Sequence, residues 1–341
     1  MPNTEHSTVN STITSTAQSA VIHVAVGVIW KNNHILIAKR LEHVHQGGLW
    51  EFPGGKVEVQ ETVQQALKRE LFEELAITSQ SLRPLIQIPY QYDQKKVFLD
   101  VWHVLSFTGQ EVGKEGQAIV WIKPDQLRDF QFPAANEPIA RAIMLPQSYL
   151  ITPANIQPNF LTELEEKLQA GIKLLQLRIK ETVPQIFFQQ FIALVKKYPV
   201  SVQINSNTWQ HYLGQENQQL IHSEWESASQ AGSQFGIHLT SHDLQQENFQ
   251  QLPGLKSASC HHAQDIQAAN QLGLDFLVLS PVLKTQTHPT QSHMGWDNFK
   301  QLSLLAQSPV YALGGMKKQY LEQAINCGAQ GIAAITGLWS R

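Results

Sequence analysis

The sequence is short of cysteine, of charge and of long apolar runs, and each shortage excludes a class of protein. Its 341 residues include two cysteines, Cys260 and Cys327, which excludes a scaffold of several disulfides and indicates a reducing compartment. Charged residues make up 16%, against about 25% in typical soluble domains, and the net charge is −3. We therefore expect no broad basic surface for a nucleic-acid polymer. No apolar run approaches the roughly 18 residues of a membrane span.

The length predicts two domains, at roughly 100–200 residues each. The first 20 residues are rich in Ser, Thr and Asn and contain neither an apolar secretory core nor any Lys or Arg. We interpret residues 1–20 as a disordered tail on a cytoplasmic protein. We expect one domain over residues 21–146 and a second over 149–341, with Pro146-Gln147-Ser148 at the boundary.

Three glutamates share one face of a predicted helix. Residues 62–75 carry apolar side chains at helical spacing, after two predicted strands (21–30 and 34–38) and a glycine-rich loop (47–55). Glu70, Glu73 and Glu74 fall at i, i+3 and i+4, so they project from the same face. An arbitrary triplet of this kind is usually a solvated acidic face. Here the preceding glycines, Glu61 and Arg69 favour a site for a hard cation, Mg²⁺ or Mn²⁺, which suits a phosphate substrate.

This arrangement resembles the signature of the Nudix hydrolases. The family pattern is Gly, five residues, Glu, seven residues, Arg-Glu-aliphatic, one residue, Glu-Glu, one residue, Gly-aliphatic. It corresponds here to Gly55, Glu61, 69–71, 73–74 and 76–77. Only the last glycine departs: Ala76 stands where the helix closes, a position that favours glycine because the backbone is left-handed. The resemblance is closest to the MutT-type 8-oxo-dGTP diphosphatases and extends over roughly residues 21–145.

The resemblance implies an α/β/α sandwich with a mixed sheet, and it assigns roles to two groups of residues. The implied metal ligands are the Gly54 carbonyl, Glu70, Glu73, Glu74 and Glu115, with Glu70, Glu73 and Glu74 as catalytic residues and Glu70 as our first choice of base. The implied base-recognition residues are Asn136, in the segment 132–138, with Arg40 and Phe52 near it. Oxidation at C8 turns a ring-nitrogen acceptor of guanine into a donor, and an amide could read that change. Two simpler interpretations remain open: a turn residue for Asn136, and a surface ion pair for Arg40.

The second half alternates short apolar runs with helical stretches, which predicts a (β/α)₈ barrel. A doubly wound sheet is the structural alternative. The predicted strands are Tyr149–Thr152, Leu174–Ile179, Val200–Asn205, Gly236–Leu239, Lys256–Cys260, Phe276–Ser280, Val310–Leu313 and Gly331–Thr336. In such barrels the chemistry lies at the carboxyl ends of the strands.

The residues at those strand ends resemble thiamine-phosphate synthase and its relative, the thiazole tautomerase TenI, over nearly all of 149–341. The resemblance implies proton transfer by His261 and metal ligation by Asp243. A purely structural His261 and a Cys/His metal site are the alternatives. The implied substrate-binding residues are Arg178, Lys180, Asn205, Ser259, Thr285, Thr287 and Gly315.

Three departures from the synthase pattern affect its chemistry. Ile179 replaces a usual Glu, Ser206 replaces one expected Mg²⁺ carboxylate, and His288 replaces a lysine over the pyrophosphate. We therefore expect this half to bind ligand, with synthase turnover in doubt.

The leading interpretation is a Mg²⁺-dependent nucleoside triphosphate pyrophosphohydrolase of the 8-oxo-dGTP type, fused to a thiamine-synthase-like barrel. Expected partners are a nucleoside triphosphate and thiamine-pathway phosphates, with no nucleic-acid polymer or membrane. A second interpretation is a thiamine-pathway synthase or tautomerase whose Nudix half clears damaged pyrophosphates. A third is a barrel that senses thiamine phosphates and regulates the hydrolase.

Overall fold

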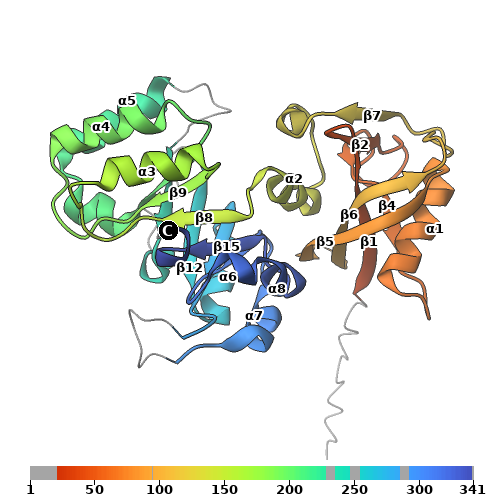
Figure 1. Cartoon of the computed structure of the whole chain (residues 1–341). Coiled ribbons are helices and arrows are strands. Elements are labelled where there is room, and N and C mark those ends of the chain that lie inside the picture. Colours follow the sequence, from red (N-terminus) through yellow and green to blue (C-terminus); the bar gives the residue numbers. More distant parts are fainter. Residues whose placement is uncertain (1–20, 94, 228–234, 246–253, 285–291, 340–341) are drawn as a thin grey trace, which may run out of the picture.

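The helices and strands form two groups that meet at residues 145–147. The computed structural model describes residues 21–93, 95–227, 235–245, 254–284 and 292–339. A sheet with its helices comes first along the chain, and a barrel follows it (Figure 1). None of the helices in these ranges is both long and apolar enough to cross a membrane. The domain limits 21–146 and 149–341 stay predictions.

Seven strands of the described residues form the first sheet, which is mixed because β1 pairs with β6 in parallel and with β2 and β4 in antiparallel fashion. The strand order is β3-β2-β1-β6-β5, with β4 on β1 and β7 on β2. The strands are β1 (Ile22–Lys31), β2 (His34–Lys39), β3 (Trp50–Glu51), β4 (Gly54–Lys56), β5 (Thr78–Gln91), β6 (Lys96–Thr108) and β7 (Ile119–Ile122).

Helices cover both faces of this sheet, as the predicted sandwich requires. On one face, α1 (Val63–Leu75) packs Leu67 and Leu71 against Ile29. On the other face, α2 (Glu137–Met144) packs Ile139 and Ala142 against the same sheet, next to the short helices η1 (Pro124–Asp129) and η2 (Ala134–Asn136). The α/β/α arrangement with a mixed sheet is confirmed.

Both ends of α1 are set by local sequence. Thr62 caps the amino end by accepting a hydrogen bond from Gln65 N, and the Gln65 side chain accepts one from Thr62 N at 2.8 Å. At the other end Ala76 has φ 58° and ψ 25°, and its N–H donates to the carbonyls of Leu71 and Phe72. Ala76 therefore adopts the left-handed conformation predicted for this position, which costs some stability because alanine has a side chain.

Replacing Ala76 with glycine should raise the free energy of unfolding by about 1 kcal/mol. A residue with a side chain loses roughly 1–2 kcal/mol in this conformation, partly offset because glycine has more freedom in the unfolded chain. Urea unfolding measures the change. The control is Lys68→Gly, at an exposed position inside the same helix, which should destabilise by about 1 kcal/mol. Destabilisation by both variants would contradict the argument.

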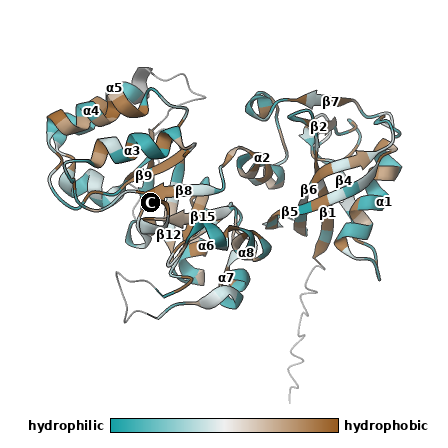
Figure 2. Ribbon diagram, in the orientation of Figure 1, coloured by the Kyte–Doolittle hydropathy of each residue, from teal (hydrophilic) through white to brown (hydrophobic). Residues whose placement is uncertain are grey.

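Eight parallel strands of the described residues close into a barrel, which confirms the eight predicted strands and excludes the doubly wound sheet. Their apolar runs form its wall (Figure 2). The strands are β8 (Ser148–Ile151), β9 (Leu174–Leu177), β10 (Ser201–Asn205), β11 (Phe235–Leu239), β12 (Lys256–Cys260), β13 (Phe276–Leu279), β14 (Val310–Ala312) and β15 (Gly331–Ala334). The intervening α-helices are α3 (Phe160–Gln169), α4 (Gln185–Val195), α5 (Gln215–Ser227), α6 (Ala263–Gln271), α7 (Gly295–Ser303) and α8 (Leu321–Asn326). A short α9 (Thr336–Trp339) follows β15.

Candidate active sites in the sheet domain and the barrel

Two glycines bring the main chain onto the glutamate face of α1. The Gly54 N–H donates to Glu74 Oε2 at 3.2 Å. A Cβ on Gly54 would lie 2.1 Å from the Ala25 carbonyl oxygen, and one on Gly55 would lie 2.2 Å from the Glu70 carboxyl carbon. Any side chain at either position would displace the strand or the glutamate. The glycine-rich loop therefore fixes where Glu70 and Glu74 lie.

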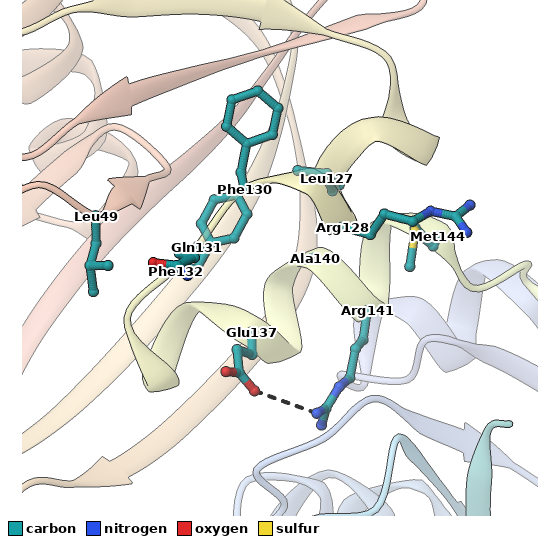
Figure 3. Close-up of a pocket in the computed structure, with 10 residues that line it drawn as sticks. All are labelled: Leu49, Leu127, Arg128, Phe130, Gln131, Phe132, Glu137, Ala140, Arg141 and Met144. Carbon is teal, nitrogen blue, oxygen red and sulfur yellow. Dashed lines mark ion pairs between the residues drawn. The ribbon is translucent and has the colours of Figure 1, made fainter. Parts of the chain in front are cut away.

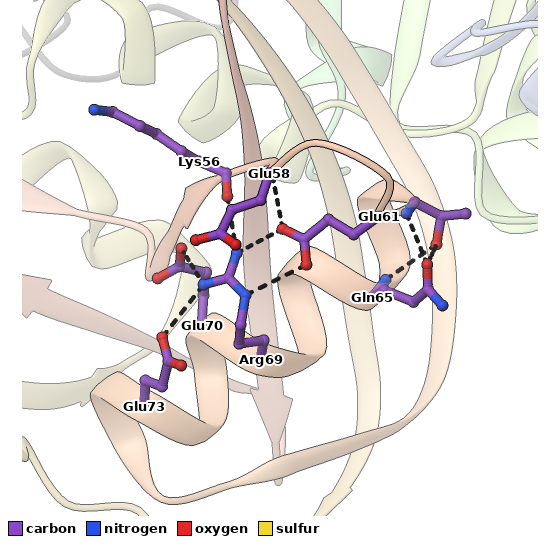
Figure 4. A network of polar contacts seen from close by, with 8 residues as sticks. Lys56, Glu58, Glu61, Gln65, Arg69, Glu70 and Glu73 are labelled. Atoms are coloured by element: carbon purple, nitrogen blue, oxygen red, sulfur yellow. Dashed lines mark hydrogen bonds and ion pairs between the residues drawn. The ribbon is translucent and has the colours of Figure 1, made fainter.

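Arg69 forms ion pairs with Glu61, Glu70 and Glu73 (Figure 4). Its Nη1 donates to Glu70 at 2.8 Å and lies 3.3 Å from a Glu73 oxygen. Its Nη2 donates to Glu61 at 2.6 Å and to the Lys56 carbonyl at 3.0 Å. These bonds raise the pKa of Arg69 and lower the pKa of Glu61. The guanidinium thus orients carboxylates and remains charged.

Negative charge is concentrated around Glu74. Burial, together with the charges of Glu51, Glu115 and Glu70, raises the pKa of Glu74 to about 8. Burial also raises the pKa of Glu51, although Arg40 opposes the shift. Glu115 comes from the segment 113–117, which is tied to α1 because Lys114 N and the Gln117 side chain donate to the Glu74 carbonyl at 2.9 and 3.1 Å.

This set of donors fits a hard divalent cation, because all its groups are oxygens and their mutual repulsion favours a bound positive charge. In the described ranges, no three His, Cys, Asp or Glu side chains already form a group that could hold a metal ion. Arg69 engages Glu70 and Glu73, while the Gly54 N–H engages Glu74. Binding of a cation therefore requires these side chains to reorient.

Asn136 lies beside an aromatic pocket and does not cap the helix it precedes. Its side chain makes no cap hydrogen bond. Instead its Oδ1 lies 3.5 Å from Phe52 N, across 84 residues of sequence. The Phe52 ring stacks on Phe132 with centroids 5.3 Å apart, and the Tyr92 hydroxyl is hydrogen-bonded to the Ala135 backbone. The Asn136 side chain thus makes a long-range contact, and its role in base recognition stays a prediction.

Arg40 is engaged within the protein. It forms an ion pair with Glu51, and its Nε and Nη2 donate to the His45 carbonyl at 3.1 and 2.9 Å. In this structure Arg40 forms an ion pair, as the simpler interpretation of this residue predicts. Contact with a substrate would require exchange of at least one of these bonds.

At the carboxyl ends of the barrel strands, Asp243 is hydrogen-bonded by its neighbours. Its Oδ2 accepts from Ser206 Oγ at 2.5 Å and from Thr240 N and Oγ1 at 3.0 and 2.6 Å. The serine that replaces the expected carboxylate thus uses Asp243 as its acceptor. A cation at this oxygen would compete with these three donors.

His261 has a defined tautomer. Its Nδ1 lies 2.7 Å from the Ser280 carbonyl oxygen, which only accepts, so Nδ1 carries the proton and Nε2 has the free lone pair. The main chain at His261 is also held, because its N–H donates to Asp265 at 2.7 Å. This geometry suits a proton acceptor at Nε2. It equally satisfies a structural histidine, so the role stays a prediction.

The predicted phosphate-binding residues of the barrel are only partly described. Arg178 N donates to Thr152 Oγ1 at 2.9 Å, and burial lowers the pKa of the Arg178 side chain. At this mouth Lys180 follows β9, and Asn205 is the last residue of the neighbouring strand β10. A Cβ on Gly315, at φ 68°, would meet the Lys284 carbonyl at 2.9 Å. Thr285, Thr287 and His288 lie outside the described residues.

Comparisons with known proteins identify both halves. Residues 25–142 match a model described as NUDIX domain, and residues 148–338 match one described as thiamine monophosphate synthase. The Escherichia coli 8-oxo-dGTP diphosphatase is 40% identical over 35% of this chain and 92% of the relative. The Escherichia coli CTP pyrophosphohydrolase is 36% identical over 36% of this chain and 92% of the relative. A putative thiamine-phosphate synthase 2 of Aquifex aeolicus is 29% identical over 56% and 97%. The chain belongs to the MutT-type Nudix hydrolases and to the thiamine monophosphate synthase family.

The structure adds three residues to the sites that sequence reasoning did not select. In the Nudix domain these are Glu51, beside the carboxylates, and Tyr92, beside Ala135 in the segment 132–138. In the barrel it is His238, whose Nε2 lies 2.9 Å from Ser259 Oγ. A lone histidine between Ile237 and Leu239 in a buried strand is a signal that could have revealed it. Glu51 and Tyr92 carry no such pattern.

Replacing Glu73 with glutamine should lower hydrolysis by the Nudix domain at least a hundredfold and leave the fold intact. The neutral amide removes one negative charge from the face that we expect to bind the cation, and the side chain is exposed, so packing is unaffected. Release of pyrophosphate at saturating Mg²⁺ measures the loss. Glu42→Gln removes an exposed carboxylate elsewhere and should retain full activity. Unchanged turnover in Glu73→Gln would contradict the metal-site assignment.

Proposed function

We propose that the Nudix domain hydrolyses oxidised purine nucleoside triphosphates, 8-oxo-dGTP above all, to the monophosphate and pyrophosphate. The observation that carries this proposal is Asn136, whose amide reaches across the domain to Phe52 N and does not cap its own helix. The names of several relatives support the same substrate.

The carboxylates that crowd α1 would hold the cation, Mg²⁺ or Mn²⁺. The proposed ligands are the Gly54 carbonyl, Glu70, Glu73, Glu74 and Glu115. A divalent ion bound there neutralises charge on the phosphate oxygens. Glu70, oriented by Arg69 at 2.8 Å, accepts the proton of the attacking water. Gly54 and Gly55 keep this carboxylate close to the main chain.

The amide of Asn136 offers both a donor and an acceptor to a purine edge. Phe52, buried and stacked on Phe132, provides an apolar wall beside it. In such a pocket an undamaged guanine leaves a polar group unpaired, which costs affinity for the wrong base. This mismatch is the proposed source of selectivity.

Asn136→Ala should therefore erode discrimination between 8-oxo-dGTP and dGTP more than it lowers turnover of dGTP. We expect the ratio of the two kcat/KM values to fall by at least tenfold, because the hydrogen bonds specific to the oxidised base are lost. Steady-state kinetics with both nucleotides measure the ratio. An equal fall for both would mean that Asn136 does not contact the altered base. CTP hydrolysis faster than either would favour the alternative of a pyrimidine substrate.

We propose that the barrel binds a phosphate-bearing thiamine-pathway ligand and makes thiamine phosphate slowly or not at all. Arg178, Lys180 and the turn at Gly314-Gly315 supply donors for a phosphate. Asp243 already accepts hydrogen bonds from Ser206 and Thr240. We therefore expect the barrel to bind a metal ion weakly and to turn over slowly. The orientation of His261 leaves room for a tautomerase-type proton transfer, and a phosphate-sensing barrel would use the same binding groups.

Ser206→Asp combined with His288→Lys should raise synthase turnover, by up to about a hundredfold if the electrostatic groups act as in comparable sites. The first change adds a carboxylate beside Asp243, since the Ser206 hydroxyl already lies 2.5 Å from it. A coupled synthase assay on wild type and double variant measures turnover, and calorimetry measures phosphate-ligand binding. Glu73→Gln is the control and should leave both unchanged. Robust synthase activity of the wild type would refute the impaired-catalyst proposal.

A further inference from the structure

The helix that follows the base-reading residue is shared between the Nudix domain and the barrel. Asn136 stands directly before α2, which extends from Glu137 to Met144. In Figure 1 this helix lies between the first sheet and the barrel. Ile139 and Ala142 face the core of the Nudix domain. The carboxyl end of the helix instead contacts barrel residues.

Gln330 of the barrel caps that carboxyl end. Its Nε2 donates to the Ala142 carbonyl at 3.0 Å and to the Leu145 carbonyl at 2.8 Å. The side chain is only 7% exposed, so water has little access to replace these bonds. Loss of the amide would leave two buried helix-end carbonyls without this donor, which is costly. Gln330 therefore fixes the end of α2 to the start of β15.

A chain of ion pairs reaches back from the barrel to the amino end of α2. Asp275 lies directly before β13 and accepts a hydrogen bond from the Lys256 N–H at 2.7 Å. It forms an ion pair with Arg141, whose Nε lies 3.2 Å from Asp275 Oδ1. Arg141 also lies 3.5 Å from Glu137, the residue next to Asn136 (Figure 3). The barrel thus contacts the helix at its last turn, and Arg141 links that contact to the first residue of the helix.

One flank of α2 borders a cavity of about 500 Å³. Its lining includes Leu49, Phe130, Phe132, Ala140 and Met144 (Figure 3). The opposite flank is buried against the sheet through Ile139 and Ala142. The barrel contacts at the carboxyl end of the helix add to this packing.

We propose that Gln330 and Asp275 of the barrel are positioning residues for base selection by the Nudix domain, acting through α2 on Asn136. The inference rests on the proposed base-reading role of Asn136. Both residues stand directly before barrel strands, at the face opposite the phosphate-binding mouth. The barrel therefore has a role in nucleotide selectivity that needs no chemistry of its own, and this role explains one use of the fusion.

The test uses the full-length chain carrying Gln330→Met or Asp275→Asn. Each variant should lower the ratio of kcat/KM for 8-oxo-dGTP to that for dGTP by about tenfold, since sub-ångström misplacement of a recognition group already weakens its contacts. Because the effect passes through Asn136, neither substitution should change the ratio further in an Asn136→Ala background. Thermal unfolding checks that each variant is folded. If Gln330→Met unfolds, Asp275→Asn still tests the proposal, because asparagine has nearly the same size as aspartate.

Glu322→Gln is the matched control. It breaks the 2.8 Å ion pair with Arg83, which joins the barrel to β5 and not to α2, so the ratio should stay at the wild-type value. A fall as large as that of Gln330→Met would show a general effect of domain docking and overturn the inference. Retained selectivity in both test variants would also overturn it, provided that Asn136→Ala loses selectivity. If Asn136→Ala itself keeps the ratio, the proposed base-reading function fails first.

Discussion

Repulsion among closely spaced carboxylates is the constraint around which the Nudix site is built. Burial of Glu74, together with the charges of Glu51, Glu115 and Glu70, raises the pKa of Glu74 to about 8. Gly54 and Gly55 bring the main chain against this face, and the Arg69 guanidinium pairs with Glu70. A divalent cation bound there would relieve the repulsion, which is the physical basis of the proposed metal dependence.

The barrel shows the opposite arrangement at its mouth. The carboxylate of Asp243 accepts hydrogen bonds from a serine and a threonine. That serine, Ser206, stands where the resemblance to the synthase implies a second anionic metal ligand. The proposed weak turnover follows from this difference, whereas the proposed phosphate binding depends on Arg178, Lys180 and the turn at Gly314-Gly315.

The two halves are connected by more than a linker. Gln330 and Asp275 hold the helix that begins beside Asn136, and Arg83 joins β5 to Glu322 of α8. Tyr311 also donates a hydrogen bond to the Pro146 carbonyl. Through these contacts the proposed effect of the barrel on the Nudix site would act.

The local sequence determined the elements whose spacing carries chemistry. Helix α1, the glutamate face and all eight barrel strands follow from periodicity and turn residues in short windows, whereas the left-handed end at Ala76 is predicted by the resemblance to the Nudix signature. The long strands β5 and β6 were not predicted, because Pro84 and Pro89 interrupt the pattern of β5 and its pairing with β6 supplies what local propensity lacks. The tertiary structure alone decided that Glu51 joins the carboxylates, that Tyr92 reaches Ala135, and that Gln330 caps α2. Each of these contacts joins residues far apart in the chain, and no periodicity in a single sequence records which distant side chains will meet.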